Sequence, residues 1–188
     1  MSIAFHISSS QHTLETMHTP PDEDPHPPPT NRPAAIEFEL IDPLSMLSSA
    51  ATKNITTWVH AVFAHLRATG SVRAKVVNDQ QMADAHQRFS GIPGTTDVLT
   101  FDLNEEDDSD TKALDTDLII CFDEAARQAH SHNHSTEHEL LLYIIHGTLH
   151  CLGYNDHTPE DYNAMHTRED QLLTSAGIGP LFDRGTSS

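Results

Sequence analysis

Basic residues are scarce in this chain. Its 188 residues include 10 lysines and arginines against 28 aspartates and glutamates, a formal net charge of −18 at pH 7. Proteins that bind nucleic acid through their own surface usually carry a basic patch, because contacts to the phosphates supply much of the affinity. The charge therefore argues against tight, unassisted binding to free nucleic acid.

Cysteines and long apolar runs are also scarce. The two cysteines, Cys121 and Cys151, are expected to be buried thiols in a reducing cytoplasm. No run approaches the roughly 18 apolar residues of a membrane span. The N-terminal stretch lacks the apolar segment of a secretory signal, and its acidic residues argue against a transit peptide. We therefore expect a cytoplasmic protein without a membrane segment.

The first 33 residues contain the stretch HTPPDEDPHPPPTNRP. Such a proline-rich, aliphatic-poor segment buries too little apolar area to offset the entropy lost on ordering. Residues 1–33 are therefore predicted to form a disordered tail. The following residues, 34–183, suffice for one domain with a sizeable core.

Apolar periodicity in this second part alternates between strand and helix patterns. Strands are expected at residues 34–41, 72–77, 97–103 and 117–122, and helices at 55–66, 80–89, 123–130 and about 159–176. A further helix is expected from the cap at Thr136 to the glycine turn at Gly153. Gly70 is expected to end the first helix, and Thr136 with Glu139 to form a capping box on the fourth. The pattern predicts a single α+β domain with a mixed sheet of about four strands and helices packed on it.

The stretch HGTLHCLGYNDH, residues 146–157, is typical of a metal site. Residues four apart lie on one helix face, so His146 and His150 can both reach one ion. Gly153 can end the helix in the left-handed conformation, and the turn after it can return His157 toward the pair. Three histidines leave an open fourth position, which is typical of catalytic zinc, whereas structural zinc normally has four protein ligands.

Two other sets of potential ligands compete with this site. His130, His134 and His138 show the same spacing of four, but their polar surroundings favour a solvated linker between two helices. Cys151 directly follows a candidate ligand, yet the next residue on a helix points about 100° away. Neither is therefore predicted to bind the ion.

The same residues resemble a known family. HGTLHCLGYNDH is similar to the H-G-x-L-H-x-x-G-Y-D-H signature of the bacterial YbeY family of metal-dependent endoribonucleases. Residues 91–101, GIPGTTDVLTF, resemble its G-x-x-x-P-T-D-V-L-S-F segment, and residues 117–121 resemble the strand that follows. The order and spacing of the three blocks agree, and the resemblance covers roughly residues 34–180.

The resemblance implies a function. It implies that residues 34–183 form a metal-dependent endoribonuclease domain that cleaves single-stranded RNA in ribosomal RNA maturation and ribosome quality control. The site would hold one ion, with zinc favoured by its nitrogen ligands, acting as a Lewis acid on the phosphate or activating a water. Because the chain is so acidic, we expect the small ribosomal subunit or a ribosomal protein to supply specificity.

Two departures from the family pattern affect individual residues. The third ligand of the family usually follows the first by ten residues, which is Asp156 here, whereas His157 lies one residue later. An aspartate would also suit zinc, but a loop absorbs a one-residue insertion, so His157 is preferred as the ligand. Asp156 is then a candidate base or orienting residue. The arginine that the family carries before the glycine of its second block is replaced by Ser90. Arg88, two residues away, is the candidate substitute.

Two other classes of function stay open at this point. A metallopeptidase-like hydrolase would share the three-histidine layout, but zinc peptidases of the HExxH type place a glutamate base where this chain has Gly147. A non-catalytic ribosome assembly factor with a structural metal would explain Ser90 and the acidic charge.

Overall fold

A mixed sheet forms the frame of the computed structural model, which describes residues 3–6, 35–104 and 113–181. Its strands within these ranges are β1 (Ile3–His6), β2 (Ile36–Ile41), β3 (Thr69–Val77), β4 (Val98–Asp102) and β5 (Ala113–Cys121), in the order β1-β4-β5-β3-β2. β4 and β5 pair antiparallel, and the other neighbours pair parallel. The four predicted strands are thus confirmed.

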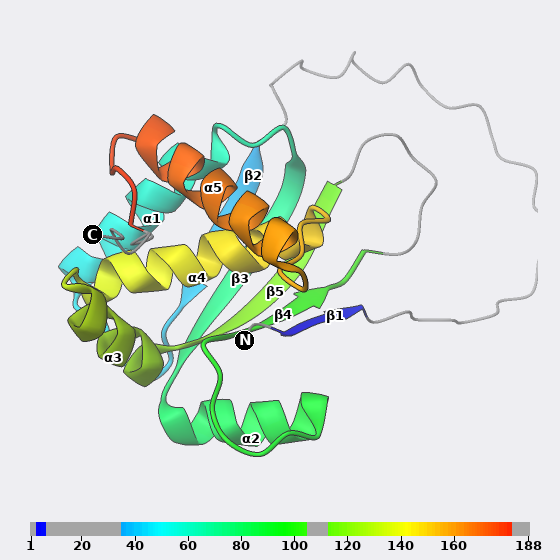
Figure 1. Cartoon of the computed structure of the whole chain (residues 1–188). Coiled ribbons are helices and arrows are strands. Elements are labelled where there is room, and N and C mark those ends of the chain that lie inside the picture. Colours follow the sequence, from blue (N-terminus) through cyan, green and yellow to red (C-terminus); the bar gives the residue numbers. More distant parts are fainter. Residues whose placement is uncertain (1–2, 7–34, 105–112, 182–188) are drawn as a thin grey trace, which may run out of the picture.

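Helices cover both faces of this sheet (Figure 1). They are α1 (Ser49–Phe63), α2 (Asp79–Ser90), α3 (Phe122–His132), α4 (Thr136–Cys151) and α5 (Pro159–Ser175). α1 and α4 pack with one face of the sheet in the main core, and α2 packs on the other face over a smaller cluster. The prediction of an α+β domain with helices on the sheet is confirmed.

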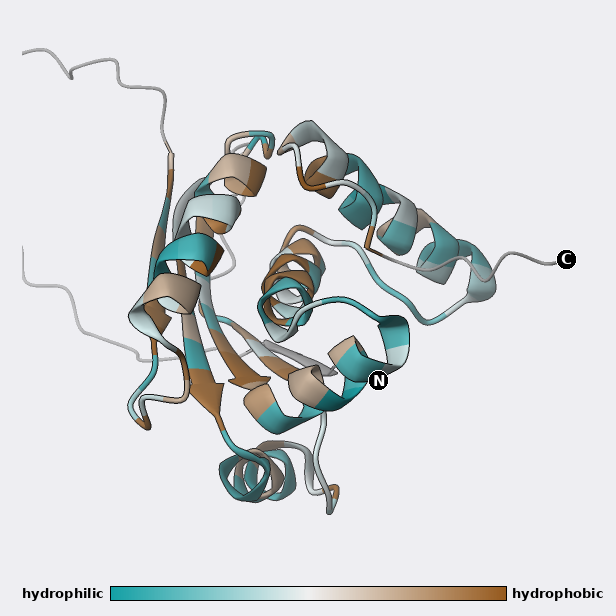
Figure 2. Cartoon of the chain, turned by 90° about the vertical axis from the view of Figure 1, so that its left-hand side faces the viewer, coloured by the Kyte–Doolittle hydropathy of each residue, from teal (hydrophilic) through white to brown (hydrophobic). Residues whose placement is uncertain are grey.

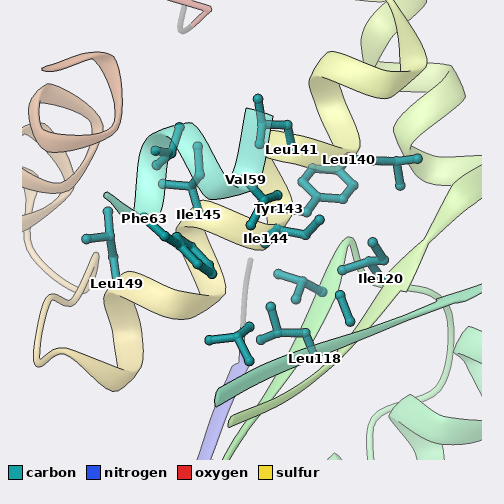
Figure 3. Packing of buried hydrophobic residues seen from close by; sticks show 14 of the residues in the cluster. Val59, Phe63, Leu118, Ile120, Leu140, Leu141, Tyr143, Ile144, Ile145 and Leu149 are labelled. Carbon is teal, nitrogen blue, oxygen red and sulfur yellow. The ribbon is translucent and has the colours of Figure 1, made fainter. Parts of the chain in front are cut away.

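α4 is the central helix of the domain. Viewed end-on in Figure 2, it lies between the sheet and α5. Its residues Leu140, Leu141, Ile144, Ile145 and Leu149 are at most 1% exposed, and Figure 3 shows α4 side chains meeting those of α1 and β5. Burying such side chains stabilises a fold by about 1.5–3 kcal/mol each. α4 is therefore a rigid support for any residue it carries.

The start of α4 differs from the predicted capping box. The side chain of Ser135, not Thr136, caps the helix by accepting a hydrogen bond from the His138 amide at 3.2 Å. The carboxylate of Glu139 instead contacts the ring of His134 at 2.5 Å. The capping-box prediction was wrong because the ring of His134 competes for the glutamate.

Two predicted boundaries also differ. α1 begins at Ser49 rather than near residue 55, because Ser48 caps it by accepting from the Ala51 amide at 3.1 Å. Gly70 does not end that helix but lies inside β3 with a φ of +110°. A Cβ atom there would lie 2.0 Å from the Leu114 carbonyl oxygen, so the glycine permits close approach of β5.

β1 falls within residues 1–33, which were predicted to be a disordered tail. The structure pairs Ile3–His6 with β4 at the edge of the sheet, so the prediction differs from the structure at these four residues. The rest of that predicted tail lies outside the described residues. Among the helices that the structure describes, none combines the length and apolarity needed to cross a membrane.

Gly147 lies where α4 touches the sheet, and substitution by alanine is predicted to destabilise the domain. An added Cβ would lie 2.6 Å from Leu118 Cδ2 and 2.8 Å from Thr100 Oγ1, both on buried side chains. Overpacking of this kind costs about 1–3 kcal/mol. Urea denaturation of Gly147→Ala should show this loss, whereas Gln171→Ala on the exposed face of α5 should change little. Equal stability of the two variants would contradict the packing argument.

Candidate metal centre

Two histidines at the end of α4 point their ring nitrogens at each other. The Nε2 atoms of His146 and His150 lie 3.1 Å apart, and the ring planes meet at 88°. Ligand nitrogens at about 2.0–2.1 Å from one zinc ion have a separation of this order. The helical spacing of four thus brings the predicted pair together as expected.

The other nitrogen of His146 is held by α5. Its Nδ1 lies 2.8 Å from Oε1 of Glu169, a carboxylate that is 2% exposed. The second oxygen of Glu169 accepts from Nδ1 of His166 at 2.5 Å. A carboxylate can only accept when ionised, so the Nδ1 atom of His146 carries a proton and Nε2 is the nitrogen left to bind a metal.

His150 is oriented by the turn after α4. Its Nδ1 atom lies 3.1 Å from the carbonyl oxygen of Tyr154, which fixes the proton on Nδ1 in the same way. Gly153 makes this turn possible with a φ of +95°, as the sequence predicted. Both imidazoles therefore turn Nε2, the nitrogen left to bind a metal, toward the same point.

The third group beside the pair is Asp156. Ligand atoms of His146, His150 and Asp156 all lie within 4.8 Å of one another, and the Asp156 side chain is 17% exposed. The side chain of His157 is 84% exposed, and its Nδ1 atom lies 3.9 Å from the nearer Asp156 oxygen. The structure thus brings Asp156 to the pair and leaves His157 outside it, so ligation by His157 stays a prediction.

Arg88 lies elsewhere. It is exposed near the end of α2, with its guanidinium 5.3 Å from the centre of the Phe89 ring. Phe89 in turn packs against Phe101 of β4, on the face of the sheet opposite to α4. The structure does not bring Arg88 to the histidine pair, and its predicted catalytic role stays untested.

The surroundings shift the pKa values of His146 and His150 in opposite directions. Burial disfavours the charged form of His146, but the hydrogen bond and negative charge of Glu169 outweigh it, and the pKa of His146 is raised. Burial and the neighbouring charge of His146 lower the pKa of His150. His150 is therefore held neutral, the form that binds a metal.

This donor set fits a divalent transition-metal ion. Two imidazole nitrogens converge, each with its second nitrogen engaged by a neighbouring acceptor, and a carboxylate lies beside them. Such an arrangement is typical of zinc sites, in which outer hydrogen bonds orient the ligating rings. The residues His146, His150 and Asp156 form what we call the helix-end site.

Glu169 and His166 escaped the sequence analysis. Both belong to α5, 15 and 18 residues beyond the end of α4 at Cys151, and only the packing of α5 against α4 brings them to His146. The one local signal was the spacing of three between His166 and Glu169 on a predicted helix, which places them side by side.

The α+β fold and the histidine pair at the end of its buried central helix are typical of a metal-binding protein. The family model described as Endoribonuclease YbeY matches residues 43–177. This match covers most of the chain, and the chain belongs to the YbeY family.

Curated relatives agree with this assignment. The Endoribonuclease YbeY of Nocardia farcinica is 37% identical over 105 residues, covering 52% of this chain and 57% of the relative. That of Frankia alni is 39% identical over 108 residues, covering 53% and 60%. The chain thus spans little more than half the length of the curated relatives it matches. A solution structure of a Thermotoga maritima protein covers 81% of this chain and 99% of its own, at 23% identity and a TM-score of 0.49.

Replacing Glu169 by glutamine is predicted to weaken metal binding at the helix-end site. The amide cannot accept from both His146 and His166 as the carboxylate does, so the ligand loses part of its orientation. Loss of such an outer partner typically costs 10–100-fold in metal affinity. Zinc affinity measured by competition with a chromophoric chelator should fall by about this factor. Glu160→Gln, at the exposed start of α5, is the control and should bind as wild type does.

The contact between His146 and Glu169 also predicts a pH dependence of the metal-free protein. The raised pKa of His146 contributes stability that is complete below the usual 6.5 and lost as pH rises through the raised value. The hydrogen bonds of His146 and His166 outweigh burial and lower the pKa of Glu169, so its contribution is complete above the usual 4.5 and lost as pH falls through the lowered value. The contact between His146 and Glu169 therefore stabilises the folded protein most between the ordinary pKa values of 4.5 for Glu169 and 6.5 for His146.

Urea denaturation in the presence of chelator tests this. The difference in unfolding free energy between wild type and Glu169→Gln should be largest near about pH 5.5 and smaller near about pH 9. A difference independent of pH would show that charge on the pair does not contribute.

Proposed function

We propose that this protein is a metal-dependent endoribonuclease that cleaves single-stranded RNA during ribosomal RNA maturation and ribosome quality control. The observation that carries the proposal is the pair of oriented Nε2 atoms 3.1 Å apart at the end of α4. Curated relatives named Endoribonuclease YbeY, which match at 34–39% identity, support the same reaction class.

We propose one zinc ion at the helix-end site, because two imidazoles and a carboxylate are ligands that zinc favours. His146 and His150 supply the nitrogens. Asp156 is better placed than His157 to be the third ligand, since it lies within 4.8 Å of the pair. A zinc ion held by these residues would supply Lewis-acid polarisation of a phosphodiester and would activate an attacking hydroxyl.

The residues around the ligands have separate tasks in this proposal. Glu169 keeps the proton on Nδ1 of His146, and the Tyr154 carbonyl does so for His150. If Asp156 binds the ion, His157 is free to exchange protons with the substrate, because its ring is exposed beside that carboxylate. Arg88 can meet RNA only away from the histidine pair, since α2 covers the opposite face of the sheet.

Exposed aromatic rings near the helix-end site support the proposal that the substrate is single-stranded. Tyr154 follows the motif helix and is 37% exposed, and Tyr162 on α5 is 42% exposed. The Tyr162 ring contacts His166, which shares Glu169 with the ligand His146. Unpaired bases stack on such rings with about 1–3 kcal/mol each, whereas bases in a duplex are not available for stacking.

The acidic charge is consistent with a partner that delivers the RNA. With a net charge of −18, long-range attraction cannot concentrate a polyanion at the site. We therefore propose the small ribosomal subunit or a ribosomal protein as the partner, and the cytoplasm as the compartment.

The glycine after the first ligand bears on the peptidase alternative. Gly147 lies against Leu118 and Thr100, so a glutamate at this position would point into the sheet rather than toward an ion. The general base of HExxH peptidases therefore has no room here.

Single substitutions test the function and the third ligand together. Cleavage of a single-stranded RNA oligonucleotide should fall more than about 100-fold in His150→Ala and in Asp156→Asn, because a lost ligand costs more than a lost outer partner. His157→Gln should cost less than Asp156→Asn. His65→Gln, outside the helix-end site, should cleave as wild type does.

Two results would count against the proposal. Undiminished cleavage by His150→Ala in the presence of chelator would eliminate metal-dependent catalysis at this site. A greater loss of zinc affinity in His157→Gln than in Asp156→Asn would restore His157 as the third ligand.

A further inference from the structure

A second cluster of potential ligands lies at the opposite end of α4. His132 ends α3, His134 lies in the connection, and Glu139 belongs to the first turns of α4. Ligand atoms of these three residues all lie within 4.8 Å of one another. Glu139 and His150 are eleven residues apart, which is about 16 Å along a helix, so this cluster is separate from the helix-end site.

The connection between the helices creates the cluster. Asn133 adopts the left-handed conformation with a φ of +56° and ends α3, and its neighbours His132 and His134 have ring centres 5.9 Å apart. Ser135 then caps α4 and leaves the side chain of Glu139 to face back to His134. The predicted solvated linker is therefore only residues 133–135.

Two of the three side chains are largely removed from solvent. The side chain of His134 is 10% exposed and that of Glu139 is 7% exposed, with Nε2 and Oε2 2.5 Å apart. His132 is exposed. The cluster is therefore buried at His134 and Glu139 and open to solvent at His132.

We propose that His132, His134 and Glu139 form a second site for a zinc-class divalent ion, which we call the helix-start site. Two imidazoles and one carboxylate suit zinc, and nickel or copper by affinity order. Ligands about 2.1 Å from an ion are at most about 4.2 Å apart. The present spread of up to 4.8 Å closes when His132, which is at the surface, turns inward.

An ion in the helix-start site would join α3 to α4. Its ligands come from the last residue of α3, the connection and the first turns of α4, and both helices contribute to the core. The ion would therefore stabilise the fold at the start of the helix whose other end carries His146 and His150. The simpler reading is that His134 and Glu139 form an ion pair with no metal, which makes no use of His132.

Zinc stoichiometry of the full chain separates these readings. Protein dialysed against zinc buffer should hold two ions per chain in wild type and one in His132→Gln/His134→Gln. The control His130→Gln changes an exposed histidine of α3 that is outside the cluster, and it should keep both ions. Two ions retained by the double variant would overturn the proposal, as would a single ion in wild type that is lost in His150→Ala.

The fluorescence of Trp58 can report ion binding at the helix-start site. It is the chain's one tryptophan, and its ring lies 4.8 Å from that of His138, the residue before Glu139. Titration with Ni²⁺ in a His150→Ala background should quench Trp58 fluorescence, and adding His132→Gln should weaken the apparent affinity at least about tenfold. Because His132 is exposed, this variant should fold normally. Equal quenching with and without His132 would contradict its role as a ligand.

Thermal unfolding gives an independent measure. Zinc at about 100 times its dissociation constant should raise the Tm of His150→Ala by roughly 5 °C. The increase should disappear when His132 and His134 are also replaced. An increase that survives these replacements would place the zinc elsewhere. None of these measurements involves RNA, so they can disprove the helix-start site without affecting the proposed nuclease function.

Discussion

The burial of α4 between the sheet and α5 is the constraint on which the rest of the structure depends. One face of this helix supplies the core with leucines and isoleucines that are fully buried. Gly147 lets the helix approach β5 and β4 closely, and α5 places Glu169 against His146. The packing that stabilises the domain therefore also fixes the tautomer and direction of the first ligand.

The sequence predicted those features that depend on local periodicity. Strands β2 to β5, the central helix, the left-handed Gly153 and the histidine pair all follow from spacings within one element or one turn. The third group at the site was not predictable in the same way. Asp156 and His157 are neighbours in a loop, and the choice between them depends on how one extra residue is accommodated, which periodicity does not specify. Glu169 depends on the packing of α5 and was missed for the same reason.

Contacts across a turn or between strands account for two other errors. Thr136 and Glu139 matched a capping box in the sequence, but Glu139 contacts His134, which only the turn between α3 and α4 brings near it. Gly70 followed a helical pattern and suggested a helix end, yet it serves the close pairing of β3 with β5. In both cases a contact that the local sequence pattern does not show prevailed over the local preference for a capping box or a helix end.

Diffraction from zinc-loaded crystals, with data collected at the zinc absorption edge, tests the central claim most directly. The account predicts an anomalous peak within bonding distance of Nε2 of both His146 and His150 and of an Asp156 oxygen, with the Glu169 hydrogen bond to His146 intact. A fully loaded protein without a peak between the two rings, or an ion bound through Nδ1 of His146 with that hydrogen bond broken, would contradict it.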